Sequence, residues 1–295
     1  MGPPYHRPTE VTLDQPVLVM FMDGWIDAGL GAASAMAHLL AAGAAEVVAS
    51  FDPDHFVDFR DRRPVARISN GLAEDLGWPE IELRSWKDRA GHDVVSLIGP
   101  EPDLAWRTFV ASVVEVSREL GVRMVVTLGA FPLSVPHTRP VKLVATAPTT
   151  ASLDLAEQVG VVRGTHTLPA PVSAAVLEGF GAAGVPALGL WARVPHYAAA
   201  MPYPAASAAL VDGLSSVAGL DLDSADLHAA AGLAHARIDG LIAASEEHSN
   251  MVRALEEAVD AEQLAPPLDP TDLPTGDEIG AELERFLRGE SGTSS

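Results

Sequence analysis

An unbroken apolar run at residues 17–22, followed at once by the turn sequence Asp-Gly-Trp-Ile-Asp-Ala-Gly at residues 23–29, constrains the fold of this chain most strongly. Six consecutive apolar residues rich in β-formers are typical of a strand covered on both faces, as in a parallel sheet. After the turn, Leu30, Ala37 and Leu40 share one helical stripe, which predicts a helix. The pattern therefore indicates a strand–turn–helix unit of an α/β fold.

The turn itself carries the first candidate site. Asp23 follows the carboxyl end of the predicted strand, which is the edge where open α/β sheets bind ligands. Gly24 permits the positive φ angle of a tight exit turn. Asp27 is placed to cap the helix by accepting from the amides of Gly29 or Leu30. The alternative is a purely structural turn with one exposed tryptophan. The candidate ligand-pocket residues here are Asp23, Gly24, Trp25 and Asp27.

A second polar segment follows another predicted buried strand, residues 124–128. Three prolines within residues 132–140 stiffen this segment and can hold its polar side chains in place. Histidine can transfer a proton and arginine can bind an anion, although these side chains can equally satisfy backbone groups in a rigid loop. The candidate residues are Gly129, His137, Thr138 and Arg139. Because both segments follow buried strands, we expect the two sets to converge at one sheet edge.

The rest of the first 220 residues alternates between strand and helix patterns. A charged segment at residues 52–64 contains Asp52, Asp54, His55 and Asp58, but no second cluster completes a metal site, so we expect no metal. A short strand at 56–59 is expected to pair with 65–68. Further strands are predicted at 46–51, 81–86, 93–98, 141–146, 161–165 and 185–192, and helices at 103–120, 172–180 and 204–218.

Composition excludes several classes of function. The formal net charge of -21 opposes binding to nucleic acid, because phosphates would be repelled. The chain has no cysteine, so disulfides and thiolate chemistry are excluded, as suits a cytoplasmic protein. No signal peptide is visible at the start. The uncharged run at residues 28–45 is rich in alanine and glycine, and we expect a soluble amphipathic helix there, with no membrane span.

The last 75 residues differ in character from the α/β core domain that we assign to residues 1–220. Residues 221–295 hold 17 acidic and 4 basic residues, a net charge of -13. Apolar residues at spacings of three and four predict a helix or helical hairpin at 224–262. A proline-rich linker at 263–275 and a terminal helix at 276–288 follow. We therefore expect an acidic C-terminal helical extension.

Several large apolar side chains fall in predicted loops or on the terminal helix. Loops run over the surface, so such side chains need a cover. Aromatic patches depleted of charge resemble the centres of protein interfaces, and we expect a homo-oligomer. The interface candidates are Phe131, Tyr197, Tyr203, Ile279, Leu283, Phe286 and Leu287.

The chain resembles the proteasome assembly chaperone 2 family in its actinobacterial branch. The matching features, which span nearly the whole chain in this order, are Gly-Trp-Ile-Asp-Ala-Gly at 24–29, Leu-Gly at 128–129, Val-Pro-His-Thr-Arg-Pro at 135–140, Tyr-Pro-Ala-Ala at 203–206 and Glu-Leu-Glu-Arg-Phe-Leu-Arg at 282–288. The resemblance implies a three-layer α/β sandwich with a mostly parallel central sheet, similar to nucleoside phosphorylases. That fold commonly forms rings, and a trimer is our preferred oligomer.

By this resemblance the expected function is that of a non-enzymatic protein-binding, assembly-chaperone-like protein with proteasome-related partners and no cofactor. In the eukaryotic system, partner surfaces and some proteasome-binding tails use a hydrophobic–Tyr–any ending, whereas this sequence ends Gly-Thr-Ser-Ser and so departs from that docking signal. The alternative is a small anionic-ligand-binding protein, or a phosphorylase-like or hydrolase-like enzyme, at the sheet edge. The sequence contains no G-x-S-x-G, H-E-x-x-H or G-x-x-x-x-G-K-[ST] motif, which disfavours that alternative.

Overall fold

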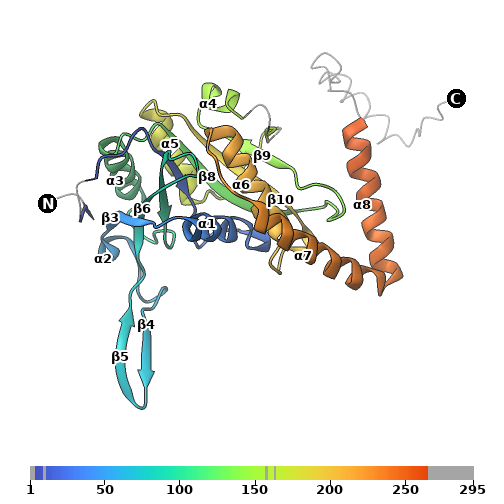
Figure 1. Cartoon of the computed structure of the whole chain (residues 1–295), viewed down its shortest axis with the longest axis horizontal. Coiled ribbons are helices and arrows are strands. Elements are labelled where there is room, and N and C mark those ends of the chain that lie inside the picture. Colours follow the sequence, from blue (N-terminus) through green and yellow to red (C-terminus); the bar gives the residue numbers. More distant parts are fainter. Residues whose placement is uncertain (1–3, 9–10, 157–158, 163, 265–295) are drawn as a thin grey trace, which may run out of the picture.

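A computed structural model describes residues 4–8, 11–156, 159–162 and 164–264, and its centre is an eight-stranded sheet (Figure 1). The strand order is β1-β3-β6-β7-β2-β8-β10-β9. The inner strands β7, β2, β8 and β10 are parallel to one another, and the outer strands pair antiparallel. The strands are β1 (Tyr5–His6), β2 (Val17–Met20), β3 (Glu46–Phe51), β6 (Ile81–Lys87), β7 (Asp93–Ile98), β8 (Met124–Leu133), β9 (Leu143–Thr146) and β10 (Ala187–Pro195).

Strand β2 lies at the centre of the sheet and is buried on both faces, as its unbroken apolar sequence predicts. Val17 and Val19 point into the core on one side of the sheet, and Leu18 and Met20 point into the core on the other. This alternation follows from the two-residue period of a strand. Two separate hydrophobic cores therefore meet at β2.

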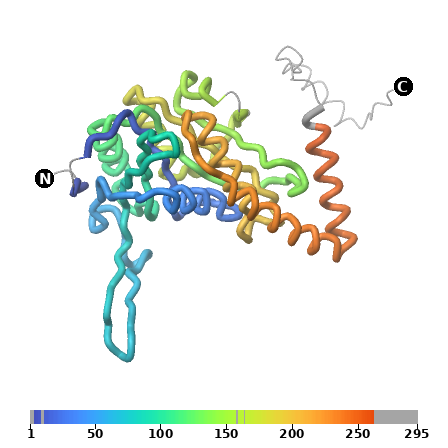
Figure 2. Tube along the Cα trace, viewed as in Figure 1, coloured from blue at the N-terminus to red at the C-terminus, as the bar shows by residue number. Residues whose placement is uncertain are grey.

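Helices cover both faces of the sheet and make a three-layer α/β sandwich. α3 (Trp106–Glu119) and α5 (Val172–Ala182) cover one face, and α1 (Gly31–Ala42) and α6 (Pro204–Ala218) cover the other. The chain-order colours of Figure 2 make the two layers easy to follow. The fold class expected from the sequence is confirmed. Short elements complete the core: 3-10 helices η1 (Ala28–Leu30) and η2 (His196–Ala198), and helices α2 (Pro53–Phe56) and α4 (Thr150–Asp154).

Two helices follow the sandwich, α7 (Ala225–Ala243) and α8 (Glu246–Leu264). α7 packs along α6 through buried residues that include Ala231 and Ile238. α8 turns away from α7 and stands beside the long connection between β8 and β9 (Figure 1). The predicted terminal helix at 276–288 lies outside the described residues. No helix in the described part of the chain is both long and apolar enough to cross a bilayer.

A two-stranded arm projects from the sandwich at the connection between α2 and β6 (Figure 2). It consists of β4 (Val65–Ser69) and β5 (Leu72–Gly77), which pair antiparallel. The expected pairing of 56–59 with 65–68 is therefore wrong, because residues 53–56 form α2 instead. Asn70 and Gly71 at the tip both have positive φ angles, as a type I′ turn requires, and this turn directs β4 onto β5.

Candidate functional site

The first candidate turn is fixed to the neighbouring strand connections by its backbone. The Asp23 amide donates to the carbonyl of Gly99 at 2.9 Å, and the amide of Glu101 donates to the Asp23 carbonyl at 2.6 Å. The Asp23 side chain is exposed at this carboxyl edge of β2. Gly24 has a φ angle of 129°, and a Cβ there would lie 2.7 Å from the Arg62 guanidinium. The φ angle favours glycine at this position, whereas the Arg62 guanidinium is the end of a flexible side chain and can move aside.

Asp27 caps α1, but from one turn further away than the sequence predicts. Its Oδ1 accepts from the amide of Ala32 at 2.8 Å and its Oδ2 from that of Ala33 at 2.9 Å. The expected partners Gly29 and Leu30 are wrong because residues 28–30 form a 3-10 turn, with φ angles of 65° and 51° at those two positions. Burial raises the pKa of Asp27, although the bonds to the two amides act in the opposite direction.

The space beside this turn is occupied largely by two indoles. The pocket at the carboxyl ends of β2 and β8 is walled by Trp25, Trp191 and the carboxylate of Glu101. Gly129 lies directly under Trp191, and a Cβ at Gly129 would come within 2.4 Å of that indole ring. The Glu101 carboxylate also accepts from the Val172 amide at the start of α5. Lys, Arg and His are absent from the described residues that line this pocket, which suits an anion poorly.

The second candidate segment lies elsewhere and contacts the C-terminal helices. The ring of His137 is buried, and its Nδ1 and backbone amide both hydrogen-bond to the Tyr197 hydroxyl, at 2.7 and 2.8 Å. Its Nε2 lies 2.9 Å from Asp239 of α7, and because a carboxylate only accepts, Nε2 carries a proton. The His235 ring lies 6.0 Å away and contacts the Tyr203 hydroxyl at 3.1 Å.

Burial shifts the pKa values of His235, Tyr197 and Tyr203. Burial, followed by the neighbouring His137, lowers the pKa of His235. Burial also raises the pKa values of the Tyr197 and Tyr203 hydroxyls. At neutral pH these three side chains are therefore uncharged and serve as hydrogen-bonding groups under α7.

Thr138 and Arg139 hold α8. Arg139 Nη2 and Nε bind the two carboxylate oxygens of Asp260 at 2.7 and 2.9 Å, and Nη1 reaches Glu256 at 3.2 Å. The Thr138 hydroxyl donates to the same Glu256 carboxylate at 2.5 Å. The Asp260 carboxylate raises the pKa of Arg139, and Arg139 lowers the pKa of Asp260. This fork-to-carboxylate geometry leaves no guanidinium edge for a ligand.

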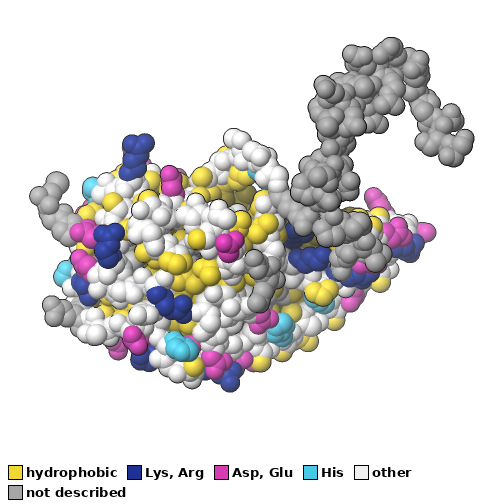
Figure 3. Space-filling model, turned by 90° about the horizontal axis from the view of Figure 1, so that it is seen from above, with side chains coloured by type: hydrophobic (Ala, Val, Ile, Leu, Met, Phe, Trp, Pro, Cys, Tyr) yellow, Lys and Arg dark blue, Asp and Glu magenta, His cyan; other side chains and the backbone are white. Residues whose placement is uncertain are grey.

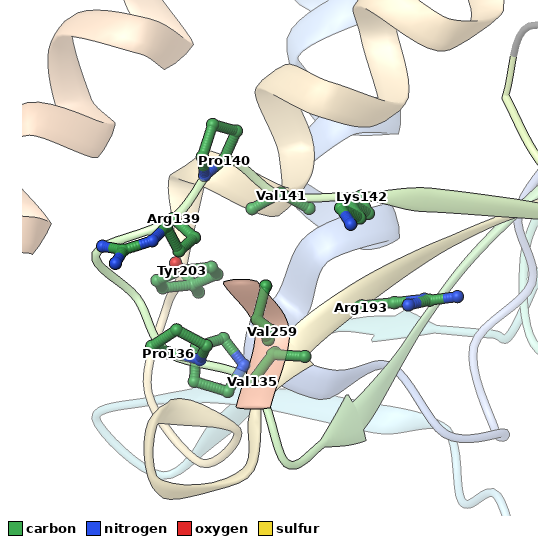
Figure 4. A pocket seen from close by; sticks show the side chains of 10 residues that line it. Val135, Pro136, Arg139, Pro140, Val141, Lys142, Arg193, Tyr203 and Val259 are labelled. Atoms are coloured by element: carbon green, nitrogen blue, oxygen red, sulfur yellow. The ribbon is translucent and has the colours of Figure 1, made fainter. Parts of the chain in front are cut away.

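The expected convergence of the two segments is therefore wrong. β8 does not end at residue 128 but continues to Leu133, so the following loop starts roughly 17 Å further along the strand. The pocket between this loop and α8 is lined mainly by prolines and valines. Its three cationic side chains, Arg139, Lys142 and Arg193, point away from one another (Figure 4). Figure 3 shows basic and acidic side chains gathered at the end of the molecule where the C-terminal helices lie.

The interface candidates separate in the same way. Tyr203 is 1% exposed and belongs to the core beneath α7, so its expected place at an interface is wrong. Tyr197 and Phe131 are partly buried. The other four candidates, Ile279, Leu283, Phe286 and Leu287, lie outside the described residues.

The residues that complete these contacts carry no recognisable signal in the sequence. Asp239, Glu256 and Asp260 look like ordinary solvent-facing acids of amphipathic helices, and Trp191 looks like a strand residue. Among the described residues, no three His, Cys, Asp or Glu side chains are grouped closely enough to hold a metal ion.

Comparison with known proteins gives the family. The model of the PAC2 family matches residues 21–242, more than half of the chain. The chain belongs to the PAC2 family. The match begins just after β2, covers the rest of the sandwich and almost all of α7, and stops before α8. Among curated proteins, none matches this chain.

Solved structures of actinobacterial proteins share the fold over most of this chain. A protein of unknown function from Corynebacterium glutamicum is 31% identical, with a TM-score of 0.82 over 89% of this chain and 99% of that one. A Mycobacterium tuberculosis proteasome-assembly chaperone homologue is 34% identical, with a TM-score of 0.73 over 80% and 99%. An archaeal proteasome activator from Pyrococcus furiosus is only 16% identical at a TM-score of 0.61 over 80% and 97%, and shares the fold alone.

Proposed function

We propose that this PAC2 protein is a non-enzymatic, assembly-chaperone-like protein whose partners are other proteins, with proteasome subunits as the partner class. Membership of the PAC2 family supports this proposal, as does the 34% identity to the mycobacterial proteasome-assembly chaperone homologue. The function would be carried out in the cytoplasm, as the absence of cysteine suits.

The observation that carries the proposal is the distribution of apolar groups between the sheet edge and the surface. At the sheet edge, where α/β enzymes bind substrates, Trp191 fills the space above Gly129. By contrast, large apolar side chains are exposed on the β4–β5 arm, where Leu72 is 70% exposed. Exposed apolar patches of this kind are characteristic of protein-binding surfaces.

The competing function, binding or turnover of a small anion at the sheet edge, has less support. The pocket there presents the Glu101 carboxylate and, among its described lining residues, no cation. The Glu101 carboxylate would repel an anion. Among the described lining residues, no positively charged side chain would bind the anion in compensation.

We also propose that the protein acts as a homo-oligomer, with a ring of three copies as the preferred arrangement. Phe131 and Tyr197 remain partly exposed side chains that such a contact can use, together with the terminal apolar residues Ile279, Leu283, Phe286 and Leu287.

The test uses purified actinobacterial proteasome α- and β-subunits mixed with and without the full-length protein. We expect a stoichiometric amount to increase the rate at which half-proteasomes form, followed by native electrophoresis and light scattering. An unrelated protein of similar negative charge serves as the control for unspecific charge effects. If the protein neither binds the subunits nor changes that rate at a tenfold excess, the proposed function is wrong.

A further inference from the structure

The cavity at the carboxyl ends of β2 and β8 combines two indole side chains with a buried carboxylate. Trp25, Trp191 and Glu101 wall it, together with apolar groups of the strand ends and the start of α5. The centre of a water-sized sphere can occupy about 30 Å³ of the cavity, so a compact group larger than one water fits there. No Lys, Arg or His is among its described lining residues, so the cavity itself offers negative charge and no positive charge.

Trp191 is held in one orientation by its surroundings. It lies beside Gly129 on the neighbouring strand, and Gly189 is two positions earlier on its own strand. A Cβ at Gly129 would come within 2.4 Å of the indole, and a Cβ at Gly189 within 3.1 Å of its Nε1. The Nε1 group also donates to the Thr146 hydroxyl at 3.2 Å. One face of the indole therefore lies against two glycines, and the other can meet a ligand with little loss of side-chain freedom.

Glu101 is a buried carboxylate that lacks a cationic partner within the described part of the chain. It is 8% exposed, and its carboxylate accepts from the Val172 amide at the start of α5. The N-terminus of that helix offsets part of the negative charge. The nearby Arg62 guanidinium pairs with Asp103 and not with Glu101. Because a buried charge without a counter-ion is costly, this position favours a ligand that brings a positive charge.

Trp25 provides the second aromatic wall from the turn after β2. Its indole is half-buried, and Asp23 on the same turn is exposed. Indole is the aromatic side chain that attracts a cation most strongly, at distances up to about 6 Å from the ring centroid. The net charge of -21 on the whole chain attracts cations from a longer range. Two indoles and one carboxylate around a small cavity thus form an arrangement suited to an organic cation.

We propose that this cavity binds a methylated ammonium group. Trp25 and Trp191 contact its methyl groups through cation–π interactions, and Glu101 supplies the counter-charge. A primary ammonium is strongly hydrated and carries three donors, whereas the described lining offers side-chain oxygens only from Glu101 and Ser173. A trimethylammonium group has no N–H donor and is compatible with apolar walls. The lining therefore favours the methylated cation over an ordinary lysine side chain.

The first test compares a cation with a neutral molecule of the same shape. Calorimetry measures the binding of choline to the full-length protein, and of its neutral isostere, in which carbon replaces the quaternary nitrogen. We expect choline to bind with a dissociation constant of about 1 mM or below, and the isostere about tenfold more weakly. Equal affinities for the two molecules, or no saturable binding of choline at about tenfold that concentration, would overturn the proposal.

The second test removes the negative charge. Glu101→Gln keeps an oxygen that can accept from the Val172 amide, so the start of α5 retains its partner. We expect choline to bind this variant about tenfold more weakly, with unchanged affinity for the neutral isostere. Glu178→Gln, at an exposed position of α5, is the matched control and should bind choline as the wild type does. Equal losses in the two variants would assign the attraction to the overall charge of the chain and contradict a specific site.

The third test removes one aromatic wall. Trp25→Leu keeps an apolar side chain but lacks the π-face, and we expect choline to bind about fivefold more weakly. Trp78→Leu is the control, because Trp78 is 50% exposed and lies outside the cavity lining. An unchanged choline affinity in Trp25→Leu, with an unchanged melting temperature, would show that the indole has no part in binding.

A trimethyllysine peptide distinguishes the two sources of such a group. Tighter binding of choline than of the peptide assigns the site to a small molecule. Tighter binding of the peptide, with its unmethylated form as control, assigns the site to a modified protein. This proposal is independent of the assembly function proposed above. Failure of choline and peptide to bind leaves the proteasome-assembly result unchanged, and failure of that assay leaves the titrations unchanged.

Discussion

Two polar segments of this protein look equivalent in sequence but have different structural roles: one caps a nearby helix, and the other holds a helix that is remote in sequence. The turn at residues 23–30 and the loop at residues 134–142 both follow a buried strand and both carry charged side chains. Asp27 in the first hydrogen-bonds to amides five and six residues away. Arg139 in the second binds a carboxylate 121 residues away. A polar segment after a strand can therefore serve local folding or long-range attachment.

The two segments also differ in how deeply they are buried. The turn is packed under η2 and α6, where the Gly29 amide donates to the Ala199 carbonyl and the Gly29 carbonyl accepts from Tyr203. The loop instead meets α8 through ion pairs in which Arg139 and Asp260 remain partly exposed. Changes in the turn should thus affect the whole fold, and changes in the loop should affect mainly α8.

The largest effect should come from Gly29→Ala. Gly29 has a φ angle of 65°, and a Cβ there would lie 2.6 Å from the Tyr203 Cβ. The left-handed conformation costs about 1–2 kcal/mol and the clash about 1–3 kcal/mol more, so we expect a loss of about 3 kcal/mol in the free energy of unfolding. Gly219→Ala is the matched control, because Gly219 has a φ angle of 64° and open space around it. Urea titrations that give equal losses for both variants would contradict the tight packing of the turn.

A smaller effect should follow Asp27→Ala. The substitution leaves the amides of Ala32 and Ala33 without their acceptor at the start of α1. Loss of a cap costs about 1 kcal/mol, and burial of the carboxylate, which already raises its pKa, keeps the net loss near that value. Asp27→Asn retains one acceptor oxygen and should lose less in the same urea titration. A loss above 3 kcal/mol would mean that Asp27 does more than cap the helix.

The smallest effect on global stability should come from Arg139→Ala. Exposed ion pairs contribute little to the unfolding of a whole domain. We expect an unchanged melting temperature but faster amide exchange in α8 than in α7, because α8 opens locally without its ion pairs. Arg237→Ala, on α7, is the control and should leave exchange in α8 unaltered. Equal exchange in the wild type and Arg139→Ala would show that apolar contacts alone hold α8.

The same ion pair gives the protection of α8 a pH dependence with a defined sign. Arg139 lowers the pKa of Asp260 below its ordinary value of 3.8. A depressed carboxyl pKa contributes stability above the unfolded pKa and loses it as the pH falls through the folded one. The protection of α8 should therefore be constant near neutrality and decline below about pH 4.

The sandwich could be predicted from the sequence because each of its strands and helices is marked by a pattern within its own few residues. Residues 17–22 and 46–51 are short runs rich in β-formers, as buried strands are. Gly121, with a positive φ angle, lies just past the end of α3, where a terminating glycine is expected. The arm could also have been found, since Asn70-Gly71 between two β-forming segments is a strong hairpin signal. The prediction that residues 65–68 pair with a strand at 56–59 overlooks this signal.

The long-range contacts could not be predicted from one sequence. Nothing in the neighbourhood of Asp239 or Asp260 distinguishes these residues from other acids of the C-terminal helices. Their partners are His137 and Arg139, and the separations of 102 and 121 residues leave no periodic pattern to read. The turn at 23–30 was predicted as a capped helix start, but the 3-10 turn that moves the cap depends on Tyr203, which is also remote in sequence.

The distance along the chain between Arg139 and Asp260 also sets an order of events during synthesis. A ribosome adds about 5–20 residues per second, so roughly 6–24 s pass between the appearance of the two residues. Throughout that interval the nascent protein displays His137 and Arg139 without the helices that later cover them. Any factor that binds this loop therefore has its easiest access before translation ends, and afterwards it must displace α8.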